Sequence, residues 1–372
     1  MLLHLLFDDK FADYVINLFD EVKEFKSIYI LVPSGKKIVH VRNTDKVNIC
    51  DIKKEGFDTL LGLISKSSAV IFHGAFYPWQ EEILKAIQGS NINKAWHVWG
   101  GEIYGQQDLK NSFLAPFSKY LNRLHKLIKS EKSQYIFPKE LLRNIDYCLT
   151  SIDEEYLFIK NYLKVGDNFR YLWYSCYNIE DTIGKSLLNE ECYGSNIWLG
   201  NSATVENNYF DIFFYLKRYF NIEERKIIVP LSYGIPWVRR FTIKLGNILF
   251  KKNFYPLVEF LPREEYNRFM LDCSVMIQPH WRQQAHGNIL TGLWLGMRVY
   301  ISEKSIEYKF LKRLGVIIYS IEKDFKCDNI NVFKRLPKDE MIINRNILIG
   351  IYGKENVKRA IINVAEILDK KY

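Results

Sequence analysis

Short apolar runs alternate with segments of helical period along most of the chain. Apolar positions recur every three to four residues in segments such as 57–64 and 79–87, which is typical of amphipathic helices. The runs between such segments are rich in Val, Ile and Leu and indicate strands. The strands expected in the first half are residues 2–7, 27–32, 69–75, 94–99 and 145–150.

The second half repeats this alternation. Continuous apolar runs, rather than strict alternation of apolar and polar residues, are typical of parallel strands that helices cover on both faces. The sequence therefore predicts an α/β fold with two doubly wound, parallel-sheet, Rossmann-like domains, residues 1–170 and 171–353, joined near residues 165–195. Residues 354–372 indicate one further amphipathic helix. The strands expected in the second half are residues 196–200, 226–231, 255–261, 274–278, 298–302 and 316–320.

Composition agrees with a folded protein and narrows its partners only slightly. The 372 residues are 48% hydrophobic and 26% charged, which is too apolar for a disordered tail. With 52 Lys and Arg against 43 Asp and Glu, the formal net charge is +9. This excess suits nucleic acid, anionic lipid or a phosphorylated substrate. It is small for the length of the chain, however, and on charge alone we favour a generic cytosolic basic protein.

Cysteine usage and hydropathy indicate a cytoplasmic protein. The six cysteines are scattered and form no C-x-x-C pair, which argues against a zinc ribbon and a disulfide scaffold and favours reduced, buried thiols. The N-terminal apolar run is too short for a signal peptide and lacks a basic flank. We find no run of roughly 18 to 20 apolar residues that would span a bilayer.

A polar loop follows the expected strand at 274–278, and a helix is expected to open at Gly287 or Asn288. A helix N-terminus offers unpaired N–H groups and partial positive charge, so this junction suits a diphosphate. The cluster of polar residues before it favours a binding loop over a merely polar connection with two surface histidines. The side chains proposed for this diphosphate cradle are His280, Arg282, Gln283 and His286, and Gly287 would admit the ligand close to the backbone.

Two other strand ends in the second half are also polar and rich in glycine. One is Gly200-Asn201-Ser202, before a helix that Ser202 could cap, and capping alone would explain this serine. The other is Ser232-Tyr233-Gly234. Together with the loop after 274–278, these strand ends predict a surface of nucleotide size.

The first half carries candidate acid-base residues at two strand ends. His73 ends one expected strand, and Glu102 follows the adjacent glycines Gly100 and Gly101 after the next. A histidine or a carboxylate can be tuned to accept a proton near neutral pH, so either could act as a general base. A hydrogen-bonded structural role is the alternative for both, and His97, inside its strand, is expected to be a packed core residue.

The clearest basic stretch is residues 113–143, in which apolar residues recur at a spacing of three to four. A basic amphipathic helix of this kind suits an anionic membrane surface. The alternative is a solvated helix whose apolar side packs on its own domain. The membrane contacts we expect are Lys119, Arg123, Lys126 and Lys129.

Several familiar motifs are missing from the sequence. It lacks the G-x-G-x-x-G dinucleotide fingerprint, a Walker A loop, H-E-x-x-H and G-x-S-x-G, which weakens dehydrogenase, NTPase, zinc protease and serine hydrolase interpretations. D-x-D is also absent. Without a carboxylate pair to hold Mg²⁺ or Mn²⁺, we expect no metal and no cofactor, and a leaving diphosphate neutralised by basic side chains and helix termini.

The chain resembles glycosyltransferase family 56 between about His73 and Tyr308. The motifs that carry the resemblance are W-G-G-E-I-Y-G at 99–105, G-N-S-A-T at 200–204, L-S-Y-G at 231–234, and Q-P-H-W-R-Q-Q-A-H-G-N-I-L-T-G-L-W-L-G at 278–296 followed by S-E-K-S. Members of this family, which are 4-alpha-L-fucosyltransferase-like, move 4-acetamido-4,6-dideoxygalactose (Fuc4NAc) from its dTDP derivative to an undecaprenyl-diphosphate-linked saccharide. This reaction belongs to the assembly of enterobacterial common antigen or related surface polysaccharides.

The resemblance implies a GT-B fold, a metal-independent hexosyltransferase, and a peripheral position on the cytoplasmic face of the bacterial inner membrane. It places His73 and Glu102 on the acceptor side, where one would be the base of an inverting reaction, and it implies that the last helix crosses back to the first domain. The nucleotide-sugar donor would be bound by Gly200, Asn201, Ser202, Ser232, Tyr233, Gly234, Gln278, His280, Arg282, Gln283, His286, Gly287 and Asn288.

The sequence leaves two alternatives open. One is another GT-B nucleotide-sugar enzyme, either a transferase for a different sugar or an epimerase. The other is a basic nucleic-acid-binding protein, which we consider weaker because no RNP-type motif and no dominant basic run outside residues 119–143 is present.

Overall fold

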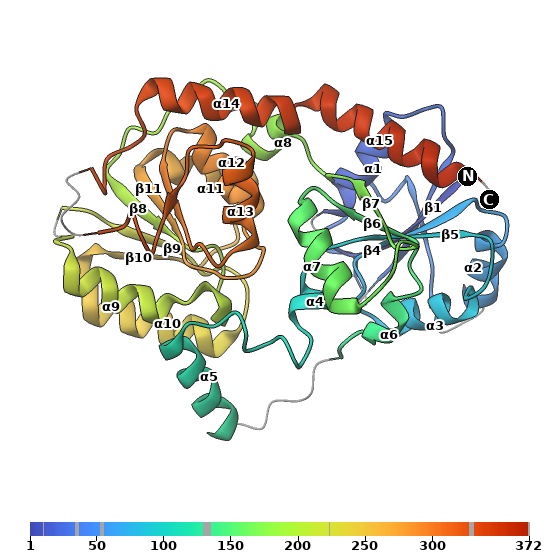
Figure 1. Ribbon diagram of the computed structural model, residues 1–372, viewed down its shortest axis with the longest axis horizontal. Coiled ribbons are helices and arrows are strands. Elements are labelled where there is room, and N and C mark those ends of the chain that lie inside the picture. Colours follow the sequence, from blue (N-terminus) through green and yellow to red (C-terminus); the bar gives the residue numbers. More distant parts are fainter. Residues whose placement is uncertain are drawn as a thin grey trace. The chain divides into compact units, whose positions relative to one another are not determined.

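The computed structural model describes residues 1–9, 11–33, 37–52, 56–128, 135–222, 224–326 and 331–370. The chain divides into two compact units, each built on its own sheet (Figure 1). The first unit comprises Met1–Gln106, Ser133–Asn178 and Tyr352–Tyr372, and the second comprises Gln107–Lys132 and Ile179–Ile351.

In the described part of the first unit, seven parallel strands form a sheet in the order β3-β2-β1-β4-β5-β6-β7. The strand order reverses between β1 and β4, as in doubly wound folds. The carboxyl ends of β4 and β5 lie next to each other, because His73 pairs with His97 in the register. The strands are β1 Leu2–Phe7, β2 Ser27–Val32, β3 Val47–Ile49, β4 Ala69–His73, β5 Asn93–His97, β6 Tyr147–Thr150 and β7 Arg170–Trp173.

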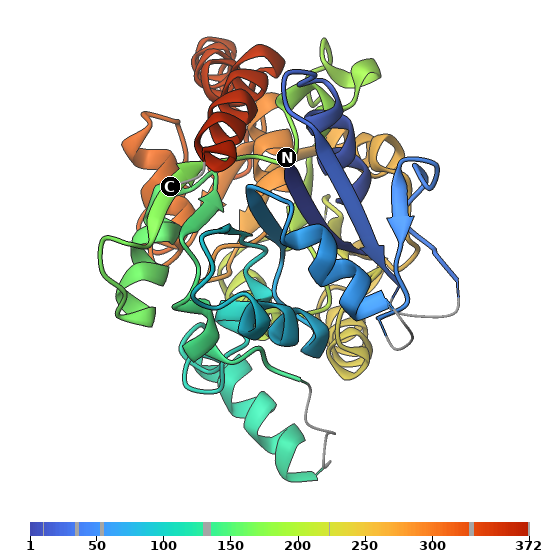
Figure 2. The same ribbon diagram turned by 90° about the vertical axis from the view of Figure 1, so that its right-hand side faces the viewer.

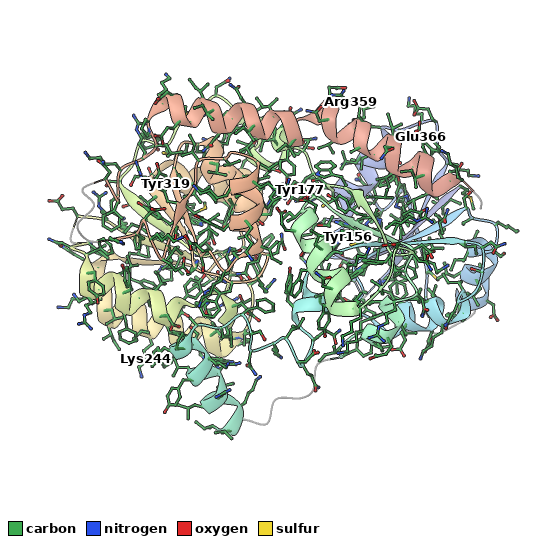
Figure 3. The ribbon with its side chains drawn as sticks, viewed as in Figure 1. Tyr156, Tyr177, Lys244, Tyr319, Arg359 and Glu366 are labelled. Carbon is green, nitrogen blue, oxygen red and sulfur yellow. The ribbon has the colours of Figure 1, made fainter. Side chains whose placement is uncertain are left out.

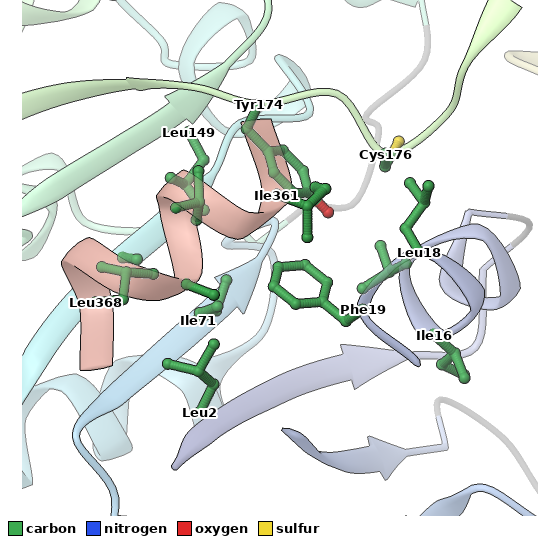
Figure 4. Close-up of a cluster of buried hydrophobic side chains, with 14 of the residues drawn as sticks. Leu2, Ile16, Leu18, Phe19, Ile71, Leu149, Tyr174, Cys176, Ile361 and Leu368 are labelled. Atoms are coloured by element: carbon green, nitrogen blue, oxygen red, sulfur yellow. The ribbon is translucent and has the colours of Figure 1, made fainter. Parts of the chain in front are cut away.

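The last helix, α15 (Lys354–Asp369), contacts α1, β1 and β7 and closes one side of the first core. Figure 4 shows Ile361 and Leu368 of this helix against Leu2, Phe19 and Ile71. Both ends of the chain are tied together here, because the Met1 ammonium group pairs with the Asp369 carboxylate. The other helices of this unit are α1 Ala12–Asp20, α2 Phe57–Ile64, α3 Pro78–Ala86, α4 Gly101–Tyr104, α6 Lys139–Leu142 and α7 Asp153–Leu163.

In the described part of the second unit, six parallel strands follow the order β10-β9-β8-β11-β12-β13. Here the order reverses between β8 and β11, and buried residues such as Val229, Ile277 and Phe213 form the core. The strands are β8 Asn196–Leu199, β9 Ile227–Pro230, β10 Phe254–Leu257, β11 Cys273–Gln278, β12 Arg298–Ile301 and β13 Tyr319–Ser320.

The helices of the second unit cover both faces of this sheet, and α5 packs against α9. Short 3-10 turns lie at Lys185–Leu187, Val205–Asn207 and Lys251–Asn253. None of the described helices has the length and apolar character needed to cross a lipid bilayer. The helices are α5 Pro116–Ile128, α8 Ile179–Ile183, α9 Tyr209–Tyr219, α10 Pro236–Phe250, α11 Arg263–Leu271, α12 His286–Trp294, α13 Ile306–Arg313 and α14 Lys338–Tyr352.

The structure confirms the predicted α/β fold with two parallel sheets. The observed elements differ from the predicted ones where a strand is short or polar. The sequence pattern missed β3, which has only three residues. It also missed β7, which lies in the stretch expected to join the two domains and begins with an exposed arginine. The unit limits also differ from the predicted 1–170 and 171–353. The first unit runs to Asn178, because β7 pairs with β6, and Gln107–Lys132 belongs to the second unit, because α5 packs on α9.

The five described cysteines are free, and four of them are buried, whereas Cys327 lies outside the described residues.

Candidate functional site

The loops predicted to bind the nucleotide meet at the carboxyl edge of the second sheet. Gly200 follows β8, Ser232 follows β9, and Gln278 is the last residue of β11. Because β8 lies between β9 and β11, these strand ends are direct neighbours. This edge is where ligands bind in doubly wound sheets.

The loops after β8 and β9 are joined through backbone contacts. The Ala203 N–H donates to the Tyr233 carbonyl (2.8 Å), and the Ile235 N–H donates to the Ala203 carbonyl (2.7 Å). Gly234 lies between these bonds with φ +118°, and a Cβ there would be 2.5 Å from the Ala203 carbonyl oxygen. Only glycine fits this position, both for its backbone conformation and for the close approach.

The loop after β8 is also joined to β11. Gly200 has φ +68°, and its carbonyl accepts hydrogen bonds from Trp198 Nε1 (3.0 Å) and Gln278 Nε2 (3.3 Å). Asn201 Nδ2 donates to the Tyr233 hydroxyl at 3.5 Å. The side chains of the predicted donor site are therefore brought together on one edge of one unit.

Ser202 lies in this loop but is committed to local structure. Its carbonyl and hydroxyl accept from Asn207 Nδ2 at 2.8 and 3.2 Å, and its carbonyl also accepts from the Tyr209 hydroxyl at 2.9 Å. The α-helix that follows begins only at Tyr209, with Asn208 at the N-cap position, so Ser202 is not its cap.

His280 was expected to help neutralise a diphosphate as a basic side chain, but its ring is neutral in the structure. Its Nδ1 lies 2.9 Å from the Arg282 carbonyl, which can only accept, so Nδ1 carries the proton and Nε2 is an acceptor. Burial lowers the pKa of His280 to about 3, so the ring is neutral at pH 7. A neutral ring that presents a lone pair cannot donate from Nε2 to a phosphate oxygen.

His286 begins α12, one residue before the predicted start, and pairs with a carboxylate that sequence reasoning missed. Its Nδ1 contacts Glu307 Oε1 in α13, and both side chains are buried. Ser305 caps α13 and accepts from the Glu307 N–H at 3.3 Å. The sequence did carry a signal for this carboxylate. Ser305, a residue type that caps helices, comes just after the expected strand at 298–302, and Glu307 follows two residues later.

The remaining loop residues have mixed roles. Arg282 and Gln283 are half-buried, and Arg282 Nη1 donates to the Gln283 carbonyl at 2.9 Å. Asn288 is inside α12 and donates to the Tyr266 hydroxyl at 2.8 Å, so it does not cap the helix. A Cβ at Gly287 would meet only a methyl group of Thr182 at 3.7 Å, so space does not require glycine there.

In the first unit, His73 lies in a buried row of three histidines. Its Nε2 is 3.1 Å from His4 Nδ1, and its Nδ1 is 3.1 Å from His97 Nδ1. Burial lowers the pKa of His73 to about 3 and lowers the pKa values of His4 and His97 well below the ordinary value. Both nitrogens of His73 are thus occupied by neutral partners, which is the hydrogen-bonded structural role that the sequence left open.

Glu102 lies in the short helix α4 and retains the properties of a base. Its Oε1 accepts from Trp96 Nε1 (3.0 Å) and the Trp99 N–H (2.9 Å), whereas its Oε2 has no hydrogen-bond partner among the described residues. Burial raises the pKa of Glu102 to about 7 in spite of these two bonds. Near neutral pH both the protonated and the deprotonated form of this carboxyl group are therefore populated.

The basic segment packs on its own unit along one face, as the second interpretation from the sequence predicts, and the membrane contact stays a prediction. One face of α5 packs on its own unit, where Phe117 contacts Phe214 and the His125 ring stacks on Trp237 at 4.4 Å. The other face is open, with Leu127 84% and Ile128 79% exposed. Lys119 is half-buried, Arg123 and Lys126 are exposed on α5, and Lys129 lies outside the described residues.

Sequence reasoning also missed His4, although a histidine in the run L-L-H-L-L-F was a visible signal of a buried polar partner. Among the described residues, no group of three or more His, Cys, Asp or Glu side chains is placed to hold a metal ion.

No protein-family model and no curated protein sequence matches the chain. Solved structures match over nearly its whole length. They include a glycosyltransferase from Rickettsia africae (9% identity, TM-score 0.63, 100% of this chain and 99% of that one) and the sucrose-phosphate synthase of Thermosynechococcus elongatus (10%, 0.61, 99% and 98%). A third, the E. coli trehalose-6-phosphate protein bound with UDP-2-fluoro glucose, has 12% identity, a TM-score of 0.59 and 99% coverage of both chains. The chain therefore has the GT-B fold.

Proposed function

We propose that this protein is a glycosyltransferase that moves a hexosyl group from a nucleotide-sugar to an acceptor hydroxyl. The observation that carries the proposal is the joined set of loops after β8, β9 and β11 at the carboxyl edge of the second sheet. The E. coli structure of the same fold is bound with UDP-2-fluoro glucose, which supports a nucleotide-sugar as the ligand of this chain.

The specific reaction we propose is transfer of Fuc4NAc from dTDP-Fuc4NAc to an undecaprenyl-diphosphate-linked saccharide in bacterial surface polysaccharide assembly. The long motif at 278–296 and the shorter motifs before it support this choice. We propose that the reaction needs no metal or other cofactor, and that nucleic acid is not a partner.

In this proposal the first turn of α12 and Arg282 bind the diphosphate. Free N–H groups at the start of a helix suit an anion, and Arg282 is the cation of the same loop. Glu102 acts as the base on the acceptor hydroxyl, because its pKa near 7 leaves much of it deprotonated at neutral pH. His73 keeps a structural role and holds the buried row of histidines together.

The test is an activity assay on the full chain with dTDP-Fuc4NAc and a panel of UDP- and dTDP-sugars, each with and without the lipid-linked acceptor. Product that contains both the sugar and the acceptor supports transfer. Conversion of the nucleotide-sugar without acceptor would instead identify an epimerase. Activity abolished by EDTA and restored by Mg²⁺ would refute the metal-free mechanism.

We further propose that α5 attaches the protein to an anionic membrane as a peripheral protein on the cytoplasmic face of the bacterial inner membrane. Neither α5 nor α10 contains an Asp or Glu, and α10 adds the exposed basic residues Arg240 and Lys244 to those of α5. Figure 3 marks Lys244 on α10, and Figures 1 and 2 show the C-terminal half of α5 extending beyond α9 and α10. Basic residues beside exposed Leu127 and Ile128 suit an anionic lipid surface.

This attachment is tested by co-sedimentation with vesicles that contain phosphatidylglycerol. The double variant Arg123→Glu and Lys126→Glu is expected to lower binding at least about tenfold, since each basic residue near such a surface contributes about 1 kcal/mol. The matched control is Lys358→Glu and Arg359→Glu on α15, which makes the same change of charge elsewhere. Equal loss in both variants would reject α5 as the contact.

A further inference from the structure

Four acceptor atoms are buried at the carboxyl edge of the second sheet without a hydrogen-bond partner among the described residues. Each of the four residues is at most 6% exposed. Buried polar atoms are paired in the great majority of cases, so four unpaired ones in the segments that follow the neighbouring strands β11 and β12 require an explanation. The atoms are Gln278 Oε1, His280 Nε2, Gln284 Oε1 and Glu307 Oε2.

The chemical character of each atom follows from the contact made by the other polar atom of the same side chain. Gln284 Nε2 donates to Asn201 Oδ1 at 3.1 Å, just as Gln278 Nε2 donates to the Gly200 carbonyl, so both free amide atoms are carbonyl oxygens. His280 donates from Nδ1 to a carbonyl, which leaves a lone pair on Nε2. Glu307 uses Oε1 for His286, so its Oε2 is also an acceptor.

The four side chains belong to two hydrogen-bonded sets, which the segment from Gln278 to His286 links along the chain. Gln278 and Gln284 bond the consecutive residues Gly200 and Asn201. The Arg282 carbonyl that accepts from His280 also accepts from the Ser305 hydroxyl at 3.5 Å, and Ser305 caps the helix of Glu307. The loop between these contacts includes a residue in a strained conformation, since Ala285 has φ +63° without being glycine.

A set of acceptors selects its ligand by chemistry. A diphosphate at neutral pH offers only acceptor oxygens and would meet repulsion from four lone pairs. A sugar ring offers hydroxyl groups and, where it is acylated on nitrogen, an amide N–H, and all of these can donate. Removing such a donor from a ligand would leave the acceptors unpaired, which is how a polar site discriminates strongly.

We infer that Gln278, His280, Gln284 and Glu307 bind the sugar part of the nucleotide-sugar through its hydroxyl or amide donors and so determine which sugar is accepted. The inference rests on the proposed function and deepens it, because it divides the edge of the sheet in two. The sugar lies against the four acceptors, and the diphosphate lies against the N–H groups of α12.

Isothermal titration calorimetry on the full chain tests this division with two probes, dTDP and dTDP-Fuc4NAc. In the variant Gln284→Leu, affinity for dTDP-Fuc4NAc is expected to fall about tenfold for the lost hydrogen bond, and affinity for dTDP is expected to stay within about twofold. The conservative variant Gln284→Glu keeps an acceptor oxygen and is expected to recover part of the loss. Ser274→Ala removes a buried hydroxyl at the opposite end of β11, where it donates to the Phe333 carbonyl, and is expected to change neither affinity.

Equal losses for dTDP and for dTDP-Fuc4NAc in Gln284→Leu would overturn the inference, because the acceptors would then have no special relation to the sugar. Unchanged affinity for both probes would overturn it as well and would indicate that the four atoms are satisfied by internal water alone. If the unmodified protein binds neither probe, the proposed function itself fails, and this outcome is seen before any variant is made.

Discussion

At the residue scale, the site depends on a few positions whose surroundings admit a single kind of side chain. Gly234 is the clearest case, because its φ of +118° disfavours a side chain and a Cβ atom there would lie 2.5 Å from the Ala203 carbonyl oxygen. We expect Gly234→Ala to lower the free energy of unfolding by about 3 kcal/mol, as strain and overpacking add. Gly62→Ala, in α2 with open space around it, should raise that free energy by about 0.5–1 kcal/mol. Urea unfolding of both variants checks the opposite signs.

Glu102 gives a second prediction at this scale, on pH dependence. A base must be deprotonated, so kcat/KM is expected to rise with pH through about 7, and Glu102→Gln should lower kcat/KM at least about 100-fold. A kcat/KM that does not change with pH near 7 would argue against Glu102 as the base.

The same carboxyl group also affects stability. Its folded pKa of about 7 lies above the ordinary value of 4.5, so the stability it contributes is present below pH 4.5 and is lost as pH rises through 7. Above pH 8, Glu102→Gln is therefore expected to be more stable than the unmodified protein by roughly 3 kcal/mol, and near pH 4 the two should be equal. Urea unfolding at both pH values measures the difference.

At the scale of elements, the row of three histidines ties β1, β4 and β5 together and makes the first unit sensitive to acid. These rings are neutral in the folded state because burial lowers their pKa values, and they bind protons once the chain unfolds. Their contribution to stability is therefore present above the ordinary pKa of 6.5 and is lost as pH falls toward 3. Between pH 6 and 4 each such ring binds about one proton on unfolding, which adds about 1.4 kcal/mol per pH unit to the slope of the free energy of unfolding against pH. His73→Gln should remove this contribution. Urea unfolding at stepped pH measures the slope, and an unchanged slope would contradict the neutral row.

The elements also show what a sequence pattern can and cannot predict. Strands β1 and β2 and helix α2 were predicted to the residue, because the strands are continuous apolar runs and the helix has a clear apolar period. The grouping of the loops after β8, β9 and β11 followed from the rule that parallel strands end at one edge. The pairing of His286 with Glu307 and the row through His4 could not be predicted, since tertiary contacts between distant segments decide both.

At the scale of the whole molecule, each unit is assembled from segments that are distant in the sequence. The first unit takes its last helix from the end of the chain, and five residues of that helix are fully buried: Val357, Ile361, Val364, Ala365 and Leu368. The opposite face of α15 carries exposed Arg359 and Glu366 (Figure 3). At about 1.5–3 kcal/mol for each large apolar side chain, removal of α15 would cost an amount comparable to the whole stability of a typical domain.

A chain that ends at residue 353 is therefore expected to lose the cooperative unfolding of its first unit, while the second unit keeps its own transition. Differential scanning calorimetry should show one transition lost. A synthetic peptide of residues 354–372 should restore this transition and raise its Tm as the peptide concentration increases, because binding to the folded state stabilises it by mass action. The double variant Arg359→Ala and Glu366→Ala serves as the control, since it changes only the exposed face of α15 and should stay within about 0.5 kcal/mol of the unmodified protein. Two intact transitions in the shortened chain would mean that the first sheet and α1 are sufficient for folding without α15, despite the apolar surface that Leu2, Phe19 and Ile71 would then expose.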